Sequence, residues 1–169
     1  MGQYYYIEEN GIHLVFMVSE KKEVFFLHCQ KSAFRETVIA EKELEGYRLV
    51  EVQAAGEDQD DHHGAKYTGT LPGRRLLFER LLDDRTERGR LITIVQKDPV
   101  SGLFVKSRFL FTGAAAVVES WTVVENRGNE SAGLTYISSF CLNGLTKSAG
   151  VPWDQAAELS VPSNSWYAK

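Results

Sequence analysis

The chain has 169 residues, of which 43% are hydrophobic and 25% are charged, with 19 lysines and arginines against 23 aspartates and glutamates. These proportions are ordinary for one globular domain, and a chain of this length can bury a core without disulfides. The net charge of −4, without a basic stripe, argues against nucleic acid as a partner. The first residues lack a basic start and an apolar h-region, and no apolar run reaches about 20 residues, so we expect no secretory signal, no membrane partner and a cytoplasmic location.

Short runs of apolar and β-branched residues, separated by turn residues, dominate the chain. In chain order they occupy residues 14–18, 24–27, 47–54, 91–95, 103–111, 117–124 and 134–142. A polar, acidic loop at 56–64 interrupts the series. Two segments are ambiguous: 33–44 has the composition of a short helix, while 74–84 suits either a helix or a buried strand. We favour the strand for 74–84 because sheet segments lie on both sides.

The clearest strand pattern follows the turn at residues 98–102, where proline presets φ and glycine tolerates a left-handed backbone. The alternation after this turn predicts one buried face, formed by Leu103, Val105, Phe109 and Phe111. Another short turn, at 126–129, follows the next strand. Three strands joined by short turns predict an antiparallel meander. We therefore predict an all-β chain, a single antiparallel β-sandwich of supersandwich type over residues 1–169, with room for one short helix.

The loop residues Asp60, Asp61, His62 and His63 are all of types that bind metals. Adjacent residues on an extended backbone point in opposite directions, and no HxxxH or HExxH spacing accompanies them. We predict an exposed loop that holds no metal. Because loops on β scaffolds commonly carry binding residues, His62 and His63 remain candidates for contact with a sugar.

Three tryptophans offer flat rings that suit the C–H faces of pyranoses. Trp153 and Trp166 lie in loop surroundings and are the better candidates for binding, whereas Trp121 lies within a strand and is expected in the core. His13 and His28 stand among strand residues and are expected to be structural. The sequence has no nucleophile elbow, no phosphate-binding glycine loop and no identifiable pair of catalytic carboxylates, so we predict neither a catalytic residue nor a cofactor.

The two cysteines, Cys29 and Cys141, lie in apolar runs and form no CxxC pair. A disulfide between them stays open at this point. Two free buried thiols would fit a reducing compartment.

A series of short motifs runs through the chain from Tyr47 onward. In order they are His63, Leu71-Pro72-Gly73, 91–98, Gly102-Leu103, Phe109 and Phe111, Val118-Glu119-Ser120, Asn126-Arg127-Gly128, Ser138-Ser139-Phe140 and Asn164-Ser165-Trp166. This order resembles the N-terminal domain of glycoside hydrolase family 36, the α-galactosidases. The resemblance implies a β-supersandwich that precedes a (β/α)₈ barrel, with both catalytic aspartates in that downstream barrel. It also implies galactosides as ligands, a natural chain that continues past Lys169, and a homo-oligomer as one option.

The chain departs from the family in two places. A family stretch similar to Tyr-Gly-x-x-Asp-x-Arg, which helps to complete a neighbouring subunit's galactose pocket, has no clear counterpart before Tyr47, and the loop at 60–64 differs from the usual family sequence. Two other functions stay open. A free-standing carbohydrate-binding module would display a platform of two or more exposed aromatic rings. A small mutarotase-like enzyme would need histidine and a carboxylate on separate strands, and the adjacency of His62 and His63 counts against it.

Overall fold

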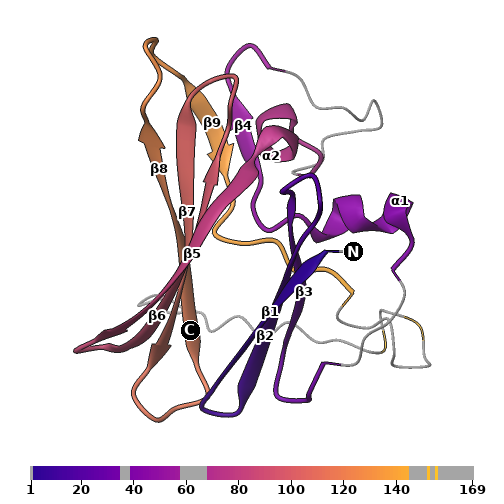
Figure 1. Cartoon of the computed structure of the whole chain (residues 1–169), viewed down its shortest axis with the longest axis vertical. Helices are drawn as coiled ribbons and strands as arrows, with labels where there is room; N and C mark the ends of the chain where they lie inside the picture. Colours follow the sequence, from indigo (N-terminus) through magenta and orange to yellow (C-terminus); the bar gives the residue numbers. More distant parts are fainter. Residues whose placement is uncertain (1, 35–38, 58–67, 145–151, 153–154, 156–169) are drawn as a thin grey trace, which may run out of the picture.

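The computed structural model describes residues 2–34, 39–57, 68–144, 152 and 155, and within them two antiparallel sheets face each other across one core (Figure 1). The first sheet contains β1 (Gln3–Glu9), β2 (Ile12–Val18) and β3 (Val24–Gln30). The second contains β5 (Leu77–Thr86), β6 (Gly89–Lys97), β7 (Leu103–Thr112) and β8 (Val118–Asn126). A small pair of strands, β4 (Val52–Ala54) and β9 (Leu134–Ile137), lies at one end.

Every pairing between these strands is antiparallel, and within each of the two larger sheets the spatial order follows the sequence order. Such meanders arise when short turns join consecutive strands, since a parallel pair would need a long crossover. The predicted all-β, antiparallel, sandwich-like fold is confirmed. The segment at 74–84 lies mostly in β5, so the choice of a strand there is also confirmed.

The helices of the described chain are short. They are α1 (Glu41–Leu44), which runs into a 3-10 helix (Glu45–Tyr47), and α2 (Leu71–Arg75). The helix expected within 33–44 is therefore reduced, in the described residues, to α1. The Leu71-Pro72-Gly73 motif begins α2, where Pro72 suits the first helical turn because the N–H that proline lacks would have no partner inside the helix.

The sequence missed one strand and made two others too long. β1 was not predicted at all, because tyrosines lie on both of its faces and hide the alternation of apolar and polar residues. The expected strand at 47–54 shortens to β4, and Arg48 forms only an isolated bridge with Phe25. The expected strand at 134–142 ends at Ile137, after which isolated backbone hydrogen bonds from Ser138 to Glu51 and from Cys141 to Leu49 replace a ladder.

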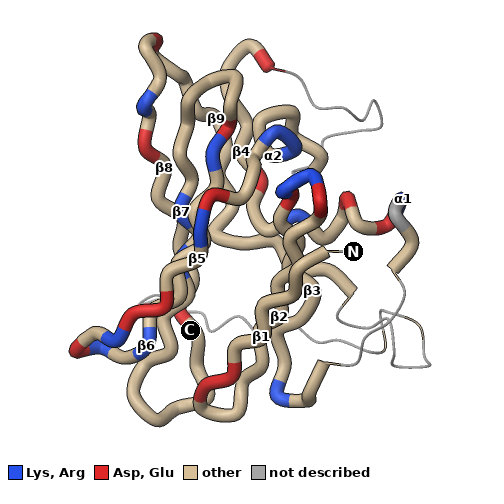
Figure 2. The backbone as a smooth tube through the Cα atoms, viewed as in Figure 1, with Lys and Arg blue, Asp and Glu red and all other residues tan. Residues whose placement is uncertain are grey.

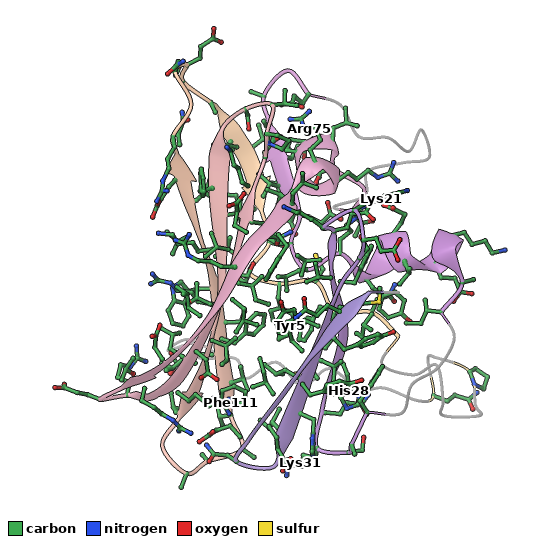
Figure 3. The ribbon with its side chains drawn as sticks, viewed as in Figure 1. Tyr5, Lys21, His28, Lys31, Arg75 and Phe111 are labelled. Atoms are coloured by element: carbon green, nitrogen blue, oxygen red, sulfur yellow. The ribbon has the colours of Figure 1, made fainter. Side chains whose placement is uncertain are left out.

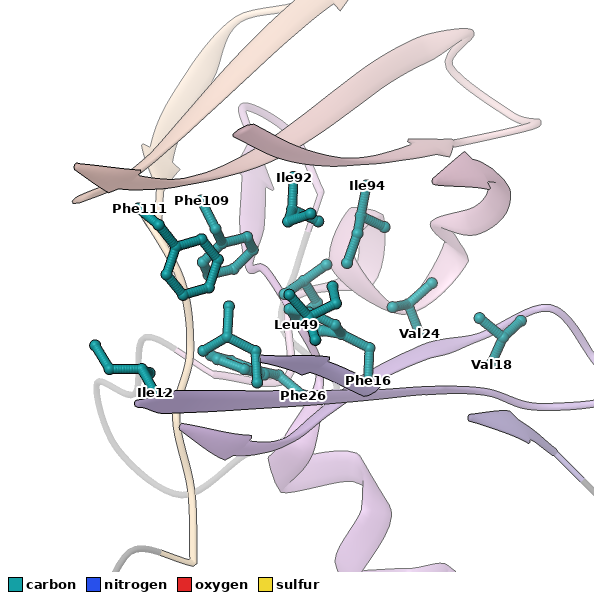
Figure 4. Packing of buried hydrophobic residues seen from close by; sticks show 12 residues of the cluster. Ile12, Phe16, Val18, Val24, Phe26, Leu49, Ile92, Ile94, Phe109 and Phe111 are labelled. Carbon is teal, nitrogen blue, oxygen red and sulfur yellow. The ribbon is translucent and has the colours of Figure 1, made fainter. Parts of the chain in front are cut away.

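The core between the sheets is formed by side chains from both of them (Figure 4). Phe16 and Phe26 stack at 4.8 Å between ring centroids, and Phe109 of the opposite sheet lies 5.3 and 5.4 Å from them. Ile92 and Ile94 of β6 have no exposed surface. All four residues predicted to share the buried face of β7 are buried, which confirms that prediction: Leu103, Val105, Phe109 and Phe111.

Trp121 is not in the core, which corrects the expectation for it. It pairs with Arg108 across the ladder, is only half-buried, and lies on the outer face with the Arg108 guanidinium 5.9 Å from the indole ring. The core-facing neighbours on β8 are Ser120 and Thr122, whose hydroxyls donate to backbone carbonyls at 138–139. At its centre the edge strand β8 therefore turns small polar residues inward and its tryptophan outward, while Val118 and Val124 nearer its ends pack against the core.

Candidate functional site

The four side chains selected from the sequence as sugar contacts lie outside the described residues. They are His62, His63, Trp153 and Trp166. The two strand histidines are described. His13 is half-buried on the outer face of the first sheet, and His28 Nε2 lies 2.7 Å from the carbonyl of Ser32.

A polar network joins α2 to the turn between β6 and β7. Arg75 Nη2 donates to Asp98 Oδ2 at 2.8 Å and to Glu57 Oε1 at 2.9 Å, so one guanidinium bridges two carboxylates. Asp98 also accepts hydrogen bonds from the Val100 N–H at 3.0 Å and from the Ser101 hydroxyl at 2.6 Å. The Asp98 side chain has no exposed surface. These hydrogen bonds fix both the turn and the end of α2. The network lies at the opposite end of the molecule from the core residue Phe111 (Figure 3).

The network decides the protonation of its members. Burial by itself would raise the pKa of Asp98, but hydrogen bonds from Arg75, Ser101 and the Val100 N–H outweigh it and hold that pKa below its usual value. Hydrogen bonds to Glu57 and Asp98 raise the pKa of Arg75 further above its already high value. Asp98 is therefore a buried, ionised turn residue and cannot donate a proton at neutral pH.

An open cleft of about 530 Å³ adjoins this network, between the β6–β7 turn and the connection from β8 to β9. Phe104 lies in its wall, with the Lys97 ammonium 5.6 Å and the Arg127 guanidinium 4.3 Å from the ring centroid. Arg127 also pairs with Glu125. The described lining contains two serines but neither histidine nor cysteine, and the hydroxyl of one of them, Ser101, is held by Asp98 within the turn.

Glu51 forms a buried clamp that sequence reasoning missed. Its side chain accepts hydrogen bonds from the Gly69 N–H at 3.0 Å, the Thr70 N–H at 3.0 Å and the Thr70 hydroxyl at 2.5 Å. Only 2% of Glu51 is exposed. A Cβ on Gly73 would lie 2.9 Å from Glu51 Oε2 and 2.4 Å from Thr70 Oγ1, so the clamp also requires a glycine at that position. The role of Glu51 is structural, since three protein donors already occupy it.

A row of aromatic side chains crosses the outer face of the first sheet, which the sequence did not reveal because its members are distant in the chain. We call it the aromatic row: Tyr4, Tyr6, Phe34 and His28. Tyr4 and Tyr6 are near parallel with 6.0 Å between ring centroids, Tyr6 lies 6.4 Å from Phe34, and Phe34 lies 5.5 Å from His28. Tyr4 is 38% exposed and Tyr6 58%. Alternation along β1 places these tyrosines outward and Tyr5 between the sheets (Figure 3).

A shallow pocket of about 340 Å³ adjoins the aromatic row. Its walls include Tyr6 and Phe34 from the row together with Glu8 and His13. Glu8 faces His13 across the β1–β2 ladder, with 3.8 Å between Glu8 Oε2 and His13 Nδ1. The pocket therefore combines aromatic surface with a carboxylate and an imidazole, which is the combination that holds a polar ligand with apolar faces.

The described residues contain no group of three or more histidines, cysteines, aspartates or glutamates placed to hold a metal ion. Cys29 and Cys141 are free thiols, and burial raises the pKa of both. None of the described helices has the length and apolar character needed to cross a membrane.

Comparison with known proteins identifies no relative: no family model, no curated protein and no solved structure matches the chain.

Proposed function

We propose that the chain is a non-catalytic β-sandwich domain of an α-galactosidase-like glycoside hydrolase, of the type found N-terminal to the catalytic barrel in family 36. In this proposal the domain packs against a downstream barrel of the same polypeptide and helps to shape the surroundings of a galactoside. One observation supports the proposal: motifs that resemble the family, in the family's order, lie at the ends of elements of one antiparallel sandwich. They are Leu71-Pro72-Gly73 at the start of α2, Asp98 after β6, Gly102-Leu103 at the start of β7 and Asn126-Arg127-Gly128 at the end of β8.

The state of the described carboxyl groups supports the non-catalytic part of the proposal. Retaining hydrolysis of a glycoside requires a nucleophilic carboxylate and an acid/base carboxyl about 5–5.5 Å apart, and the acid must have a raised pKa. Hydrogen bonds from arginine or lysine instead lower the pKa of Glu9, Asp83 and Glu125. Asp98 is ionised and buried. Groups in this state do not serve as the acid.

An aryl α-galactoside assay on the purified chain tests this part. We expect no turnover above that of buffer. Turnover that disappears on substitution of a single residue, with Glu57→Gln and Glu130→Gln as the first variants because both residues line the cleft, would contradict the proposal. The coding sequence beyond the codon for Lys169 tests the proposed association with a catalytic barrel. A downstream (β/α)₈ barrel with two aspartates at strand ends would support that association.

A free-standing carbohydrate-binding module is the second candidate. The exposed rings of Tyr4 and Tyr6 favour it, because such a module needs a platform of two or more exposed aromatics. The two candidates differ in the gene: a stop codon directly after Lys169 would favour the module over the barrel-associated domain.

A further inference from the structure

We propose that the outer face of the first sheet binds a chain of neutral hexopyranose sugars, with the aromatic row as the stacking surface. Tyr6 is the central ring, and Glu8 and His13 are the partners of the sugar hydroxyls. This inference does not rest on the proposed association with a catalytic barrel, since it concerns only residues of the first sheet and of the segment that follows β3.

The position of the aromatic row leaves two of its rings, those of Tyr4 and Tyr6, accessible. Part of the same outer face is covered, because Ile39, Leu44 and Tyr47 pack onto Phe25 and Leu27 of β3. Phe34 belongs to the same cluster and its ring lies 6.4 Å from that of Tyr6, yet Tyr4 and Tyr6 of β1 keep 38% and 58% of their surface exposed. Contiguous exposed apolar surface marks interaction sites, whereas single exposed apolar residues are ordinary, and tyrosine is enriched at interfaces.

The dimensions of the row suit a chain molecule rather than a single ring. Successive centroids are separated by 6.0, 6.4 and 5.5 Å from Tyr4 through Tyr6 and Phe34 to His28. Rings so close to one another leave no room for a sugar between them. Since Phe34 is tilted by 53° to Tyr6 and His28 by 63° to Phe34, a ligand must lie over the outer surface of the row rather than on one shared ring plane. The pocket of about 340 Å³ beside Tyr6 lies near the lower end of the roughly 300–1,000 Å³ of small-molecule sites, which suits one sugar residue seated within a longer chain.

The polar groups beside the row can form hydrogen bonds with the hydroxyl groups of a sugar. The Glu8 side chain is 68% exposed, and its carboxylate can accept hydrogen bonds from two neighbouring hydroxyls at once. His13, 3.8 Å from Glu8, can donate or accept according to its tautomer. Aromatic side chains contact the apolar C–H surfaces of a pyranose, while Glu8 and His13 form hydrogen bonds with the hydroxyls at its edge. Sites for small polar molecules commonly combine these two kinds of contact.

Charge argues against other occupants of the row. Single-stranded nucleic acid also stacks on aromatic rows, but it requires a positively charged groove. Here the chain carries a net charge of −4, and Glu8 and Glu9 lie at one end of β1. The central stretches of β2 and β3 carry no charged residue (Figure 2). A proline-rich peptide would find aromatic surface, but its prolines lack the N–H donors that Glu8 could accept.

Native affinity electrophoresis of the whole chain tests the proposal. The probes are galactomannan, glucomannan, soluble cellulose and starch, each cast into a gel, with a polymer-free gel as reference. We expect at least one polymer to retard the wild-type chain. In that gel Tyr6→Ala should weaken the apparent affinity by about tenfold or more, and Tyr4→Ala should weaken it less because Tyr4 is less exposed and lies further from the pocket. Leu82→Ala is the matched control, because Leu82 is 39% exposed on β5 of the other sheet, and it should bind as the wild type does.

Each outcome of this experiment has a defined meaning. Retardation by none of the four polymers overturns the proposal, and so does retardation that Tyr6→Ala leaves unchanged while its thermal unfolding matches the wild type. Binding of a proline-rich peptide in place of every polymer assigns the row to a peptide and also overturns it. Retention of binding by Tyr6→Phe, with loss in Tyr6→Ala, supports stacking by the ring. None of these results affects the α-galactoside assay or the search for a barrel, so the two proposals fail separately.

Discussion

Substitution of Arg75 by methionine tests whether the network around Asp98 stabilises the fold. The variant keeps a long side chain but removes the guanidinium, leaving a carboxylate with no exposed surface and no cation. Breaking a buried ion pair in this way costs about 3–5 kcal/mol. Asp98 would retain the Val100 N–H and the Ser101 hydroxyl as donors, so we expect about 3 kcal/mol, at the lower end of that range.

The effect of Arg75→Met should depend on pH. In the wild type the pKa of Asp98 is lowered in the folded state, so Asp98 stabilises the fold above its unfolded pKa and loses that contribution as pH falls through the folded value. Without Arg75, burial dominates and should raise the folded pKa of Asp98 above its unfolded value. Protonation of Asp98 at low pH should then remove the buried charge and stabilise the folded variant. The difference in free energy of unfolding between the two proteins should therefore shrink as pH falls from 7 to about 3.

Urea unfolding followed by tryptophan fluorescence at several pH values measures both effects. The control is the double variant Arg75→Met, Asp98→Asn, which removes the buried charge and should be more stable at pH 7 than Arg75→Met alone. A cost below about 1 kcal/mol for Arg75→Met, or a cost that does not change with pH, would refute the reasoning, because it would mean that solvent compensates the charge of Asp98.

Three further predictions concern other parts of the chain. Phe109→Ala should cost about 3–5 kcal/mol of unfolding free energy, because Phe109 is 2% exposed in the core, and near-neutral urea unfolding would contradict its packing. Gly73→Ala should cost about 1–3 kcal/mol, since its Cβ would disrupt the contact between Glu51 and Thr70; a thermal unfolding temperature equal to that of the wild type would contradict the clamp. Protein purified without chelators should carry no stoichiometric zinc, and zinc lost on substitution of both histidines of residues 60–63 would contradict the metal-free loop.

The sequence predicted the sheets well where their signals were local. The alternation from Leu103 to Phe111 lies within one strand, and the turn at residues 98–102 carries its own proline, serine and glycine. Both depend on neighbouring residues, and both agree with the structure. The signal of β1 is equally local, but two of its outward residues are tyrosines. Aromatic rings therefore occupy both faces, and the two-residue alternation of apolar and polar side chains disappears.

The candidate sites depend on contacts between distant segments, which is why the sequence did not reveal them. Arg75 meets Asp98 across 23 positions and Glu57 across 18, while Phe34 reaches Tyr6 only because the segment after β3 folds back over the sheet. Composition favours an exposed location for Glu51 and Asp98, since isolated carboxylates are costly to bury. Both are buried because specific donors surround them, and such donors cannot be identified before the fold is known.

Acidic residues perform three different tasks in this chain, and their partners rather than their identity separate these tasks. Glu51 is enclosed by donors of residues 69–70 and holds the entry to α2, while Asp98 is enclosed by Arg75 and its own turn and holds the β6–β7 connection. Neither has an oxygen to offer an external ligand without breaking the fold. Glu8 differs, because it is exposed and has an imidazole at 3.8 Å as its neighbour. A ligand hydroxyl can therefore reach Glu8 at no cost to the core, and this difference in partners is the physical reason for placing a binding site at the aromatic row rather than at either buried carboxylate.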